Sequence, residues 1–430
     1  MRAVLSHETS RSDARVPPKA VVAPHVSVVI VNRNYGAFVG QTIDSIRSQT
    51  YPWFECLIVD NGSDDNSRDV IRRHMADDPR FRLLEFGSNL GHLGAAFEVL
   101  GELTGEFVCF ADADDFLFPD YLASHVQVHL AVSQPLAISS SNLLEINRLG
   151  QIVNGTCPWM IRGVQPGPRG FRSGPNVPRV SVLSDPQYDE LSDATTLVPA
   201  STPGWLWGPG TSTMYRRSLM ELVRPVVSGK VQFGGVDAYF NPFIHALSGT
   251  ALIDLPLSTY RIHGQNDYTV RPMMHGIQTG TKKAELVSLE VRKLLMATVL
   301  ERADTVSWIM GPDRFWTAFD TMPNRLGRDL SAFHAGLVDA FAQNYGLLKD
   351  VFGEQELMAQ LRQRLTHRDF RRLIRKVYDD RVPLATGRLV VKTEIARHAR
   401  RALRRLKRAY RMAGRAMRRR NDSVLPLTTP

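Results

Sequence analysis

The stretch Phe110-Ala-Asp112-Ala-Asp114-Asp115 places three acidic residues at the end of an apolar run, residues 106–111. A run of this composition is typical of a strand buried on both faces. Because alternate residues of an extended chain point to the same side, Asp112 and Asp114 present two carboxylates together. Such crowding is costly unless a cation offsets it, and carboxylate oxygens suit a hard divalent ion. The alternative is a solvated acidic turn that caps the next helix.

Short apolar runs alternate with helical patterns before this stretch. This order favours a parallel α/β sheet with right-handed crossovers, and ligands of open α/β sheets bind at the carboxyl ends of the strands. The sequence therefore predicts the α/β class, with a binding site near the acidic stretch. We expect strands at 25–32, 54–60, 81–86 and 106–111, and helices at 38–48, 70–74 and 93–103.

The pattern changes twice further along the chain. Residues 154–203 are rich in Pro, Gly and Ser without a clean period, which predicts an insertion or a loop region on the acceptor side. We expect the other elements of this half to be strands at 137–146 and 210–215, helices at 217–223 and 237–247, and an extended segment at 251–263. From residue 282 onward the pattern is helical, over 284–309, 327–352 and 354–378.

This organisation predicts four parts. They are a flexible leader (1–24), a sheet domain (25–268), a helical C-terminal region (269–390), and a basic amphipathic helix with a tail (391–430). No stretch approaches the ~20 apolar residues that a membrane-spanning helix needs.

Two other polar clusters follow predicted strands. Asp60, in Val59-Asp60-Asn61-Gly62-Ser63-Asp64, can accept hydrogen bonds from a base or a ribose hydroxyl. Asn32, Asn34 and Tyr35 offer amides and an aromatic face after the first strand. The alternative for the Asp60 cluster is a turn whose side chains cap the next helix.

These motifs jointly resemble the nucleotide-binding half of family 2 glycosyltransferases of the GT-A fold. The resemblance covers residues 26–120 and depends on the segments 27–34, 46–52, 57–64, 89–91 and 110–115. It implies a GT-A-type, mostly parallel sheet, with residues 25–130 binding the nucleotide sugar and 131–268 forming the acceptor half. It also implies donor-binding roles, which fall on Asn32, Asn34, Tyr35, Asp60, Asn89 and Asp112.

The resemblance implies a divalent metal, Mn²⁺ or Mg²⁺, held by Asp112 and Asp114, with Asp114 the closer ligand. Tyr260-Arg-Ile-His263 resembles the family's closing segment, whose histidine lies near the diphosphate and the metal. His263 is therefore a third candidate ligand, although a lone histidine is more often structural. One departure is Ala95-Ala-Phe97, where the family often has Ala-Arg-Asn with an arginine that approaches the nucleotide. That contact is absent here or supplied elsewhere, and His92 is a candidate.

The acceptor half resembles the family more loosely. Asp237, in Gly234-Gly-Val-Asp-Ala-Tyr-Phe240, matches the acid that the family places before a helix. Its implied role is the base that deprotonates the acceptor hydroxyl, and the alternative is a helix cap. Trp205 and Trp207 flank the expected acceptor pocket, where aromatic rings can pack on sugars, although core packing explains them equally well.

The predicted function is an inverting glycosyltransferase that moves a sugar, most readily from a UDP-sugar, to an acceptor hydroxyl in surface polysaccharide or glycolipid assembly. A single addition is expected, because the Gln-x-x-Arg-Trp segment of processive synthases is missing. The alternatives are a nucleotide-sugar-binding protein without catalysis and a sugar nucleotidyltransferase. The latter usually has a Gly-rich loop after the first strand, which this sequence lacks, and the Gly-x-Gly-x-x-Gly of dehydrogenases is also missing.

The net charge of +10 comes from one segment, because residues 397–420 contain twelve Lys or Arg and no acid. Apolar residues recur at three- and four-residue steps through 395–420, which predicts an amphipathic basic helix for an anionic membrane surface. A helix docked on the body or on a partner is the alternative, and no nucleic-acid partner is expected. Three cysteines, of which Cys56 and Cys109 lie in apolar runs, indicate buried thiols and a reducing setting. The expected location is cytoplasmic, peripheral at the inner face of the plasma membrane, with a glycan or lipid-linked acceptor.

Overall fold

The computed structural model describes a defined part of the chain: residues 22–132, 136–156, 170, 178–200, 202–225, 234–266, 282–322 and 330–378. By contacts, the chain divides into two compact units, residues 1–370 and 371–430. The predicted leader falls almost wholly outside the described residues, and so does the predicted basic helix with its tail.

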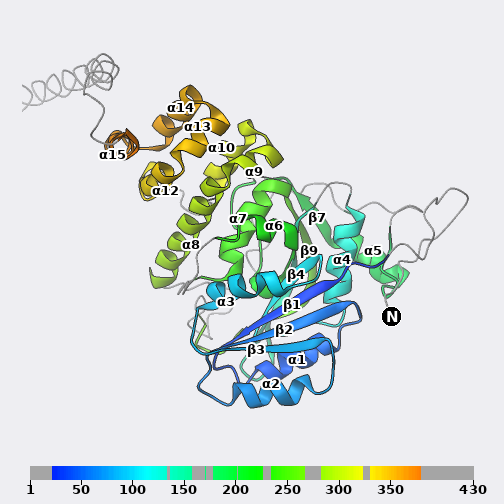
Figure 1. Cartoon of the computed structure of the whole chain (residues 1–430). Helices are drawn as coiled ribbons and strands as arrows, with labels where there is room; N and C mark the ends of the chain where they lie inside the picture. The colour runs from blue at the N-terminus through cyan, green and yellow to red at the C-terminus, as the bar shows by residue number, and fades with distance from the viewer. Residues whose placement is uncertain are drawn as a thin grey trace, which may run out of the picture. The chain divides into compact units, whose positions relative to one another are not determined.

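Within the described residues, nine strands form one sheet in the order β3-β2-β1-β4-β8-β5-β9-β7, and β6 pairs with β5 (Figure 1). The strands are β1 (Val26–Asn32), β2 (Phe54–Asn61), β3 (Phe81–Phe86), β4 (Phe107–Asp112), β5 (Ile138–Asn147), β6 (Ile152–Asn154), β7 (Thr195–Val198), β8 (Thr213–Arg216) and β9 (Thr250–Ile262). The predicted α/β class is confirmed. The first four strands are parallel, as predicted.

The second half of the sheet is mixed rather than mostly parallel. β8 runs antiparallel to both of its neighbours, β4 and β5, whereas β5 and β9 are parallel. β7 closes this edge as an antiparallel partner of β9. The sequence did not predict these directions, because periodicity marks a strand without fixing its direction.

Helices cover both faces of the sheet. The helices of the sheet domain are α1 (Val39–Arg47), α2 (Ser67–Met75), α3 (His92–Val99), α4 (Tyr121–Ala131), α5 (Asp185–Ala194), α6 (Arg217–Leu222) and α7 (Val236–Ser248), with 3-10 turns η2 (Leu100–Glu102) and η3 (Gly210–Ser212). Every residue of β1 is buried, and its alternate side chains point to opposite faces. Val28 and Ile30 belong to the cluster that includes Ile43 of α1 and Val70 of α2. On the other face, α3 contacts β1, β2 and α7.

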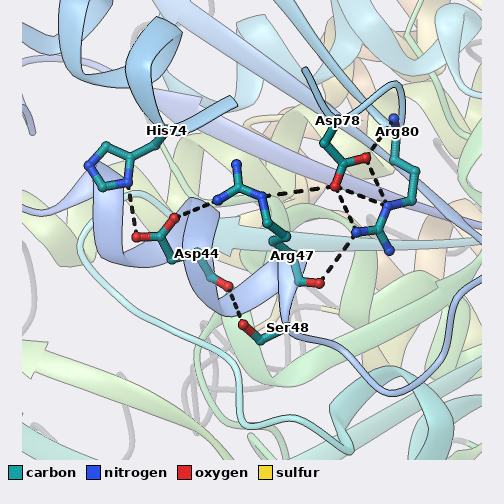
Figure 2. A network of polar contacts seen from close by, with 6 residues as sticks. All are labelled: Asp44, Arg47, Ser48, His74, Asp78 and Arg80. Atoms are coloured by element: carbon teal, nitrogen blue, oxygen red, sulfur yellow. Dashed lines mark hydrogen bonds and ion pairs between the residues drawn. The ribbon is translucent and has the colours of Figure 1, made fainter. Parts of the chain in front are cut away.

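A chain of charged side chains joins α1 to α2 and to the loop before β3 (Figure 2). Asp44 accepts a hydrogen bond from Arg47 at 2.8 Å and lies 2.9 Å from Nδ1 of His74. Asp78 lies 3.9 Å from Arg47 and 2.7 Å from Arg80. These groups are partly exposed, so the network orients the two helices relative to each other but contributes little to the free energy of folding.

The Pro- and Ser-rich region is more regular than predicted. Its described part contains α5 and the edge strand β7. Helix α5 begins with a capping box, in which Ser184 and Gln187 satisfy each other's backbone groups, and a proline stands in its first turn. Proline is favoured there because its missing N–H would be unpaired in any case. The composition that indicated a loop therefore marks the start of a helix.

The described residues after 282 are helical, as predicted, but their helices are shorter than the three predicted ones. They are α8 (Lys282–Glu301), α9 (Ala303–Met310), α10 (Pro312–Thr321), α11 (Leu330–Ala335), α12 (Val338–Gln343), α13 (Tyr345–Phe352), α14 (Glu354–Arg364) and α15 (His367–Tyr378), the last of which crosses from the first compact unit into the second. Within the first unit, α8 and α10 contact α7 of the sheet domain. No helix in the described ranges has the length and apolar character required to cross a bilayer.

Two cysteines of the sheet, Cys56 and Cys109, are buried free thiols, which confirms the expectation for both. Cys157 lies outside the described residues.

A close approach of backbone at Gly105 gives a test of the packing beside β4. A Cβ atom there would lie 2.5 Å from the backbone nitrogen of Ser27 in β1. We expect Gly105→Ala to lower the free energy of unfolding by about 1–3 kcal/mol, the usual cost of overpacking. Chemical denaturation measures this. Gly87→Ala is the control, because nothing lies within 4 Å of a Cβ at that position, and an equal loss in both variants would contradict the packing at Gly105.

Candidate active site

The carboxyl ends of β1, β2 and β4 bring the predicted donor and metal residues to one edge of the sheet. Asn32 is in register with Asp60, and Val31, its neighbour in β1, is in register with Asp112. The residues predicted from three separate motifs therefore lie together at the carboxyl ends of the strands, where an open α/β sheet binds its ligands.

Asp60 is the most enclosed acid of this edge, with 0% of its residue surface exposed. Its Oδ1 accepts hydrogen bonds from Nε of Arg68 at 2.8 Å and from the Ser63 amide at 3.1 Å, and Nδ2 of Asn32 lies 3.3 Å from its Oδ2. Burial alone would raise the pKa of the Asp60 carboxyl, but hydrogen bonds from Ser63 and Arg68 hold it below its usual value. Asp60 is therefore a buried, paired carboxylate.

The loops beside Asp60 are held by short polar contacts. Asn34 has a positive φ of 61°, accepts a hydrogen bond from the Asp64 amide, and donates its own backbone N–H to Ser63 Oγ. Asn89 Oδ1 accepts from Nδ2 of Asn61, which brings the Asn-x-Gly segment against the end of β2. Both predicted donor residues thus lie at the expected edge, and their side chains brace its loops.

The acidic stretch lies against the segment that follows β9. Nε2 of His263 lies 2.8 Å from Oδ2 of Asp114, and both side chains are largely buried. The ring of His263 stacks on Phe38 and meets the edge of Tyr35, with centroids 5.5 and 5.7 Å apart. Tyr35 therefore lies beside the expected metal ligands.

Asp112 is more open than Asp114. Its side chain is 32% exposed and lies 3.8 Å from Nε2 of His92, at the start of α3. His92, the candidate for the family's missing arginine, thus faces Asp112 at this edge.

Asp115 joins three segments of the site. Its Oδ1 accepts the Arg261 backbone N–H of β9 at 2.6 Å, and its Oδ2 accepts the hydroxyl of Thr211 at 3.1 Å. The same Thr211 hydroxyl accepts the Asp112 backbone N–H at 3.0 Å. Burial raises the pKa of Asp115 well above its usual value, and the nearby charges of Asp114 and Asp112 raise it further. Asp115 is thus a buried residue whose hydrogen bonds join three segments, rather than an exposed metal ligand. We call the bonds among Asp115, Thr211, Arg261 and the Asp112 backbone the clamp.

Arg261 is almost fully buried and braces the acidic loop. Its Nε donates to the backbone oxygen of Asp114 at 2.6 Å, and a terminal nitrogen donates to Gln41 of α1 at 2.8 Å. Its guanidinium lies 5.0 Å from the centre of the Phe38 ring. Arg261 therefore braces the acidic loop against α1.

The carboxylates of Asp112 and Asp114 suit Mn²⁺ or Mg²⁺ in ligand type, whereas the imidazole of His263 is a donor more typical of transition metals than of Mg²⁺. Nevertheless, no group of three or more acid, histidine or cysteine side chains among the described residues is arranged to hold a metal ion by itself. The side chains here fit only part of a coordination sphere.

The acceptor candidates are placed differently from one another. Asp237 lies in the first turn of α7 and is half-buried, and its Oδ1 accepts the next backbone N–H at 2.8 Å. Trp207 is fully buried and donates from Nε1 to Thr250, so it presents no ring face to an acceptor, and the core-packing alternative holds for it. Trp205 is partly exposed and meets Trp207 edge to face at 5.2 Å.

Sequence reasoning missed Arg68 and Thr211 and did not foresee the clamp made by Asp115. Arg68 is the second residue of α2, and its side chain reaches Asp60 only once this helix has formed beyond the Asn-Gly-Ser turn. No sequence pattern marks Thr211 as a site residue. Its partners, Asp112 and Asp115, are about 100 residues away, and only the pairing of β4 with β8 brings them close.

The fold defines an α/β domain with acidic side chains at the carboxyl ends of its parallel strands. Comparison with known proteins makes the assignment specific. Residues 27–132 match the model of Glycosyl transferase family 2, and this segment contains β1 to β4 with Asp60, Asp112 and Asp114. The chain thus carries a family 2 glycosyltransferase domain.

Two relatives share this part of the chain. An uncharacterized glycosyltransferase of Nostoc sp. (alr2836) is 28% identical over 245 residues, which are 56% of this chain and 66% of that protein. A Bacillus subtilis glycosyltransferase named for teichuronic acid biosynthesis, TuaG, is 27% identical over 121 residues, 28% of this chain and 48% of that protein. The matched part thus spans about half to two thirds of the length of these relatives.

Among solved structures, S. aureus TarS (residues 1–349, in complex with UDP) has 14% identity and a TM-score of 0.43. The match covers 83% of this chain and 88% of TarS. A likeness at this level does not transfer function.

The Thr211 hydroxyl gives a test of the clamp. We expect Thr211→Val to lower the free energy of unfolding by about 1–3 kcal/mol, because the Asp112 N–H and the buried Asp115 carboxyl each lose a partner. Denaturant titration measures the loss. Thr305→Val, at an exposed hydroxyl on α9, should change it by less than about 0.5 kcal/mol. Equal stability of the Thr211 variant and the unmodified protein would show that the clamp contributes nothing.

Proposed function

We propose that this protein is an inverting glycosyltransferase that moves a sugar from a nucleotide-diphosphate sugar, a UDP-sugar, to an acceptor hydroxyl. One observation carries the proposal. The family-matched segment contains a pair of carboxylates, Asp112 and Asp114, on the same sheet edge as Asp60 and Asn32, and Asp114 lies beside His263.

The donor would bind along this edge, with its nucleoside near the ends of β1 and β2 and its diphosphate near the acidic stretch. Asn32, Asn34, Asp60 and Asn89 would shape the nucleoside end. His92 would lie beside Asp112, the donor-binding residue at the end of β4. The N-terminus of α3 adds a positive partial charge close to that point, which favours an anionic ligand.

A metal ion would reduce the repulsion between the two carboxylates. Asp112 and Asp114 would hold Mn²⁺ or Mg²⁺, with oxygens of the donor completing its shell, and the ion would stabilise charge on the leaving diphosphate. His263 would orient the Asp114 carboxylate through their 2.8 Å contact. Asp115 would keep both acids in place, since Thr211 links its carboxyl to the Asp112 backbone.

Asp237 would act as the base. An acceptor hydroxyl is a weak nucleophile, and a carboxylate within hydrogen-bond reach can take its proton during attack on the anomeric carbon. The partly exposed Trp205 would pack against the acceptor sugar. Single displacement by the acceptor would invert the configuration at that carbon.

The acceptor would be a glycan or a lipid-linked sugar of a surface polysaccharide, reached from the cytoplasmic face of the membrane. The name of TuaG supports a polysaccharide product. The basic residues 395–420 would hold the enzyme at anionic lipid, where each basic residue adds about 1 kcal/mol.

Donor turnover tests the proposal and its alternatives. UDP-, GDP- and dTDP-sugars are incubated with the full chain and added Mn²⁺ or Mg²⁺, and release of nucleoside diphosphate is measured. We expect metal-dependent release from a UDP-sugar. Binding of a nucleotide sugar without turnover favours the non-catalytic alternative, and condensation of a sugar phosphate with a nucleoside triphosphate favours the nucleotidyltransferase.

Asp114→Ala should lower turnover at least about a hundredfold, because an ion that stabilises a leaving group contributes several kcal/mol. Asp114→Asn keeps a hydrogen-bond partner for His263 and should lose activity similarly. Asp69→Ala removes an exposed acid of α2 and should have no effect. Full turnover in a folded Asp114→Ala protein would refute the metal role.

Asp237→Asn should lower kcat by about 10²- to 10⁴-fold with donor binding retained, because only the proton transfer is lost. Asp313→Asn is the matched control, since Asp313 is likewise the second residue of its helix, α10. Rates with saturating donor and acceptor measure the difference. Equal rates for the two variants would leave Asp237 with only a capping role.

A further inference from the structure

Two exposed apolar side chains lie on the hairpin that joins β5 to β6. Leu149, in the turn, is 82% exposed, and Ile152, the first residue of β6, is 64% exposed. Single exposed apolar residues are ordinary on a protein surface. Here, however, two of them share one short turn, and residues 146–154 contain one cation, Arg148, and no acid. The hairpin tip is therefore a small apolar surface with a positive charge.

The turn is held in shape by its own polar groups. Oδ1 of Asn147 accepts the backbone N–H of Leu149 at 2.9 Å and that of Gln151 at 3.0 Å. The Asn147 backbone oxygen accepts the N–H of Gly150, whose φ of 82° lies in the left-handed region that glycine adopts without strain. The tip can therefore enter a less polar medium with these backbone N–H groups already paired and with little further ordering of the chain.

The hairpin borders the candidate active site. The backbone oxygen of Arg148 accepts a hydrogen bond from a terminal nitrogen of Arg261 at 3.3 Å. The guanidinium of Arg148 lies 6.0 Å from the centre of the Phe38 ring, and the same ring stacks on His263. Because His263 contacts Asp114, a surface that meets the hairpin lies beside the acidic stretch.

The charge of the hairpin complements an anionic lipid surface. Arg148 is exposed, and within the described part of the chain no carboxylate forms an ion pair with it. Aliphatic side chains next to a cation match a bilayer in which hydrocarbon lies beneath a layer of anionic headgroups. A free polyanion would not use the aliphatic side chains, and a neutral bilayer would not use the charge. Another exposed apolar pair, Trp308 and Ile309 of α9, has the exposed acid Asp304 one helical turn earlier, which disfavours an anionic surface.

We propose that the tip of the β5–β6 hairpin enters the headgroup region of an anionic membrane, with Leu149 and Ile152 between the lipids and Arg148 on a lipid phosphate. This contact goes beyond the proposed function, because it forms whether or not a sugar is transferred. It is also separate from any contact that residues 395–420 make. The hairpin brings the edge of the sheet that carries the acidic stretch to the bilayer surface, within reach of an acceptor held in the membrane.

Flotation of the full chain with vesicles tests this contact. Vesicles of phosphatidylcholine alone are compared with vesicles that also contain phosphatidylglycerol, and we expect stronger binding to the second kind. Replacing both aliphatic residues, as Leu149→Ser with Ile152→Thr, should lower the partition coefficient about tenfold or more, because their burial in the bilayer is lost. Arg148→Ala should lower it about fivefold, and only on the anionic vesicles. All variants keep residues 395–420, so the loss belongs to the hairpin.

Trp308→Ser is the matched control, because it removes an exposed apolar side chain near an acid and should leave the partition coefficient unchanged. The double variant should keep the thermal midpoint of the unmodified protein, since exposed positions contribute little to stability. Undiminished vesicle binding by the double variant, or an equal loss in Trp308→Ser, overturns the inference and leaves the proposed sugar transfer standing. Loss of donor turnover is measured without vesicles, so failure of the proposed function is distinguished from failure of the membrane contact.

Discussion

The hydrogen bonds of the Asp115 carboxyl hold together segments that lie far apart in the sequence. One oxygen accepts the backbone of β9 and the other accepts Thr211 of η3, while the Asp115 backbone oxygen accepts the hydroxyl of Thr42 in α1. Because the carboxyl is buried, each of these bonds forms in a medium where an unmade bond is costly. These bonds therefore link the segments that carry Asp112, Asp114 and His263.

The site is built by pairing its acids with cations or donors that come from other elements. Arg68 neutralises Asp60, Arg261 donates to the backbone of the acidic loop, and His263 contacts Asp114. Asp112 is more exposed than Asp114. The edge therefore combines a braced framework with a small open acidic surface, which suits an anionic ligand that arrives together with a cation.

Much of this arrangement could be predicted from the sequence, and the reasons differ between elements. β1 and β4 were predicted because strands buried on both faces are continuous apolar runs, and the acids at their ends mark the edge that binds ligands. The direction of β8 and the helix α5 were not predicted, since pairing is a tertiary property and a proline is ambiguous between a loop and a first turn.

For the predicted site residues, the sequence predicts the position in the sheet better than the exposure of the side chain. Acids and amides at strand ends could be placed at the correct edge, because topology alone puts them there. Which of them would be exposed depends on partners from other elements, as Arg68 over Asp60 and the buried ring of Trp207 show. Burial of this kind requires the packed structure.

The position of β8 also affects how the protein is made. β4 pairs with β8, and Phe107 is in register with Arg216. The ribosome therefore synthesises β8 about 100 residues after β4, the strand with which it pairs. Until then, β4 has an open backbone edge next to its apolar faces. The open edge of β4 therefore remains exposed during synthesis, and the sheet can be completed only after translation has continued through β8.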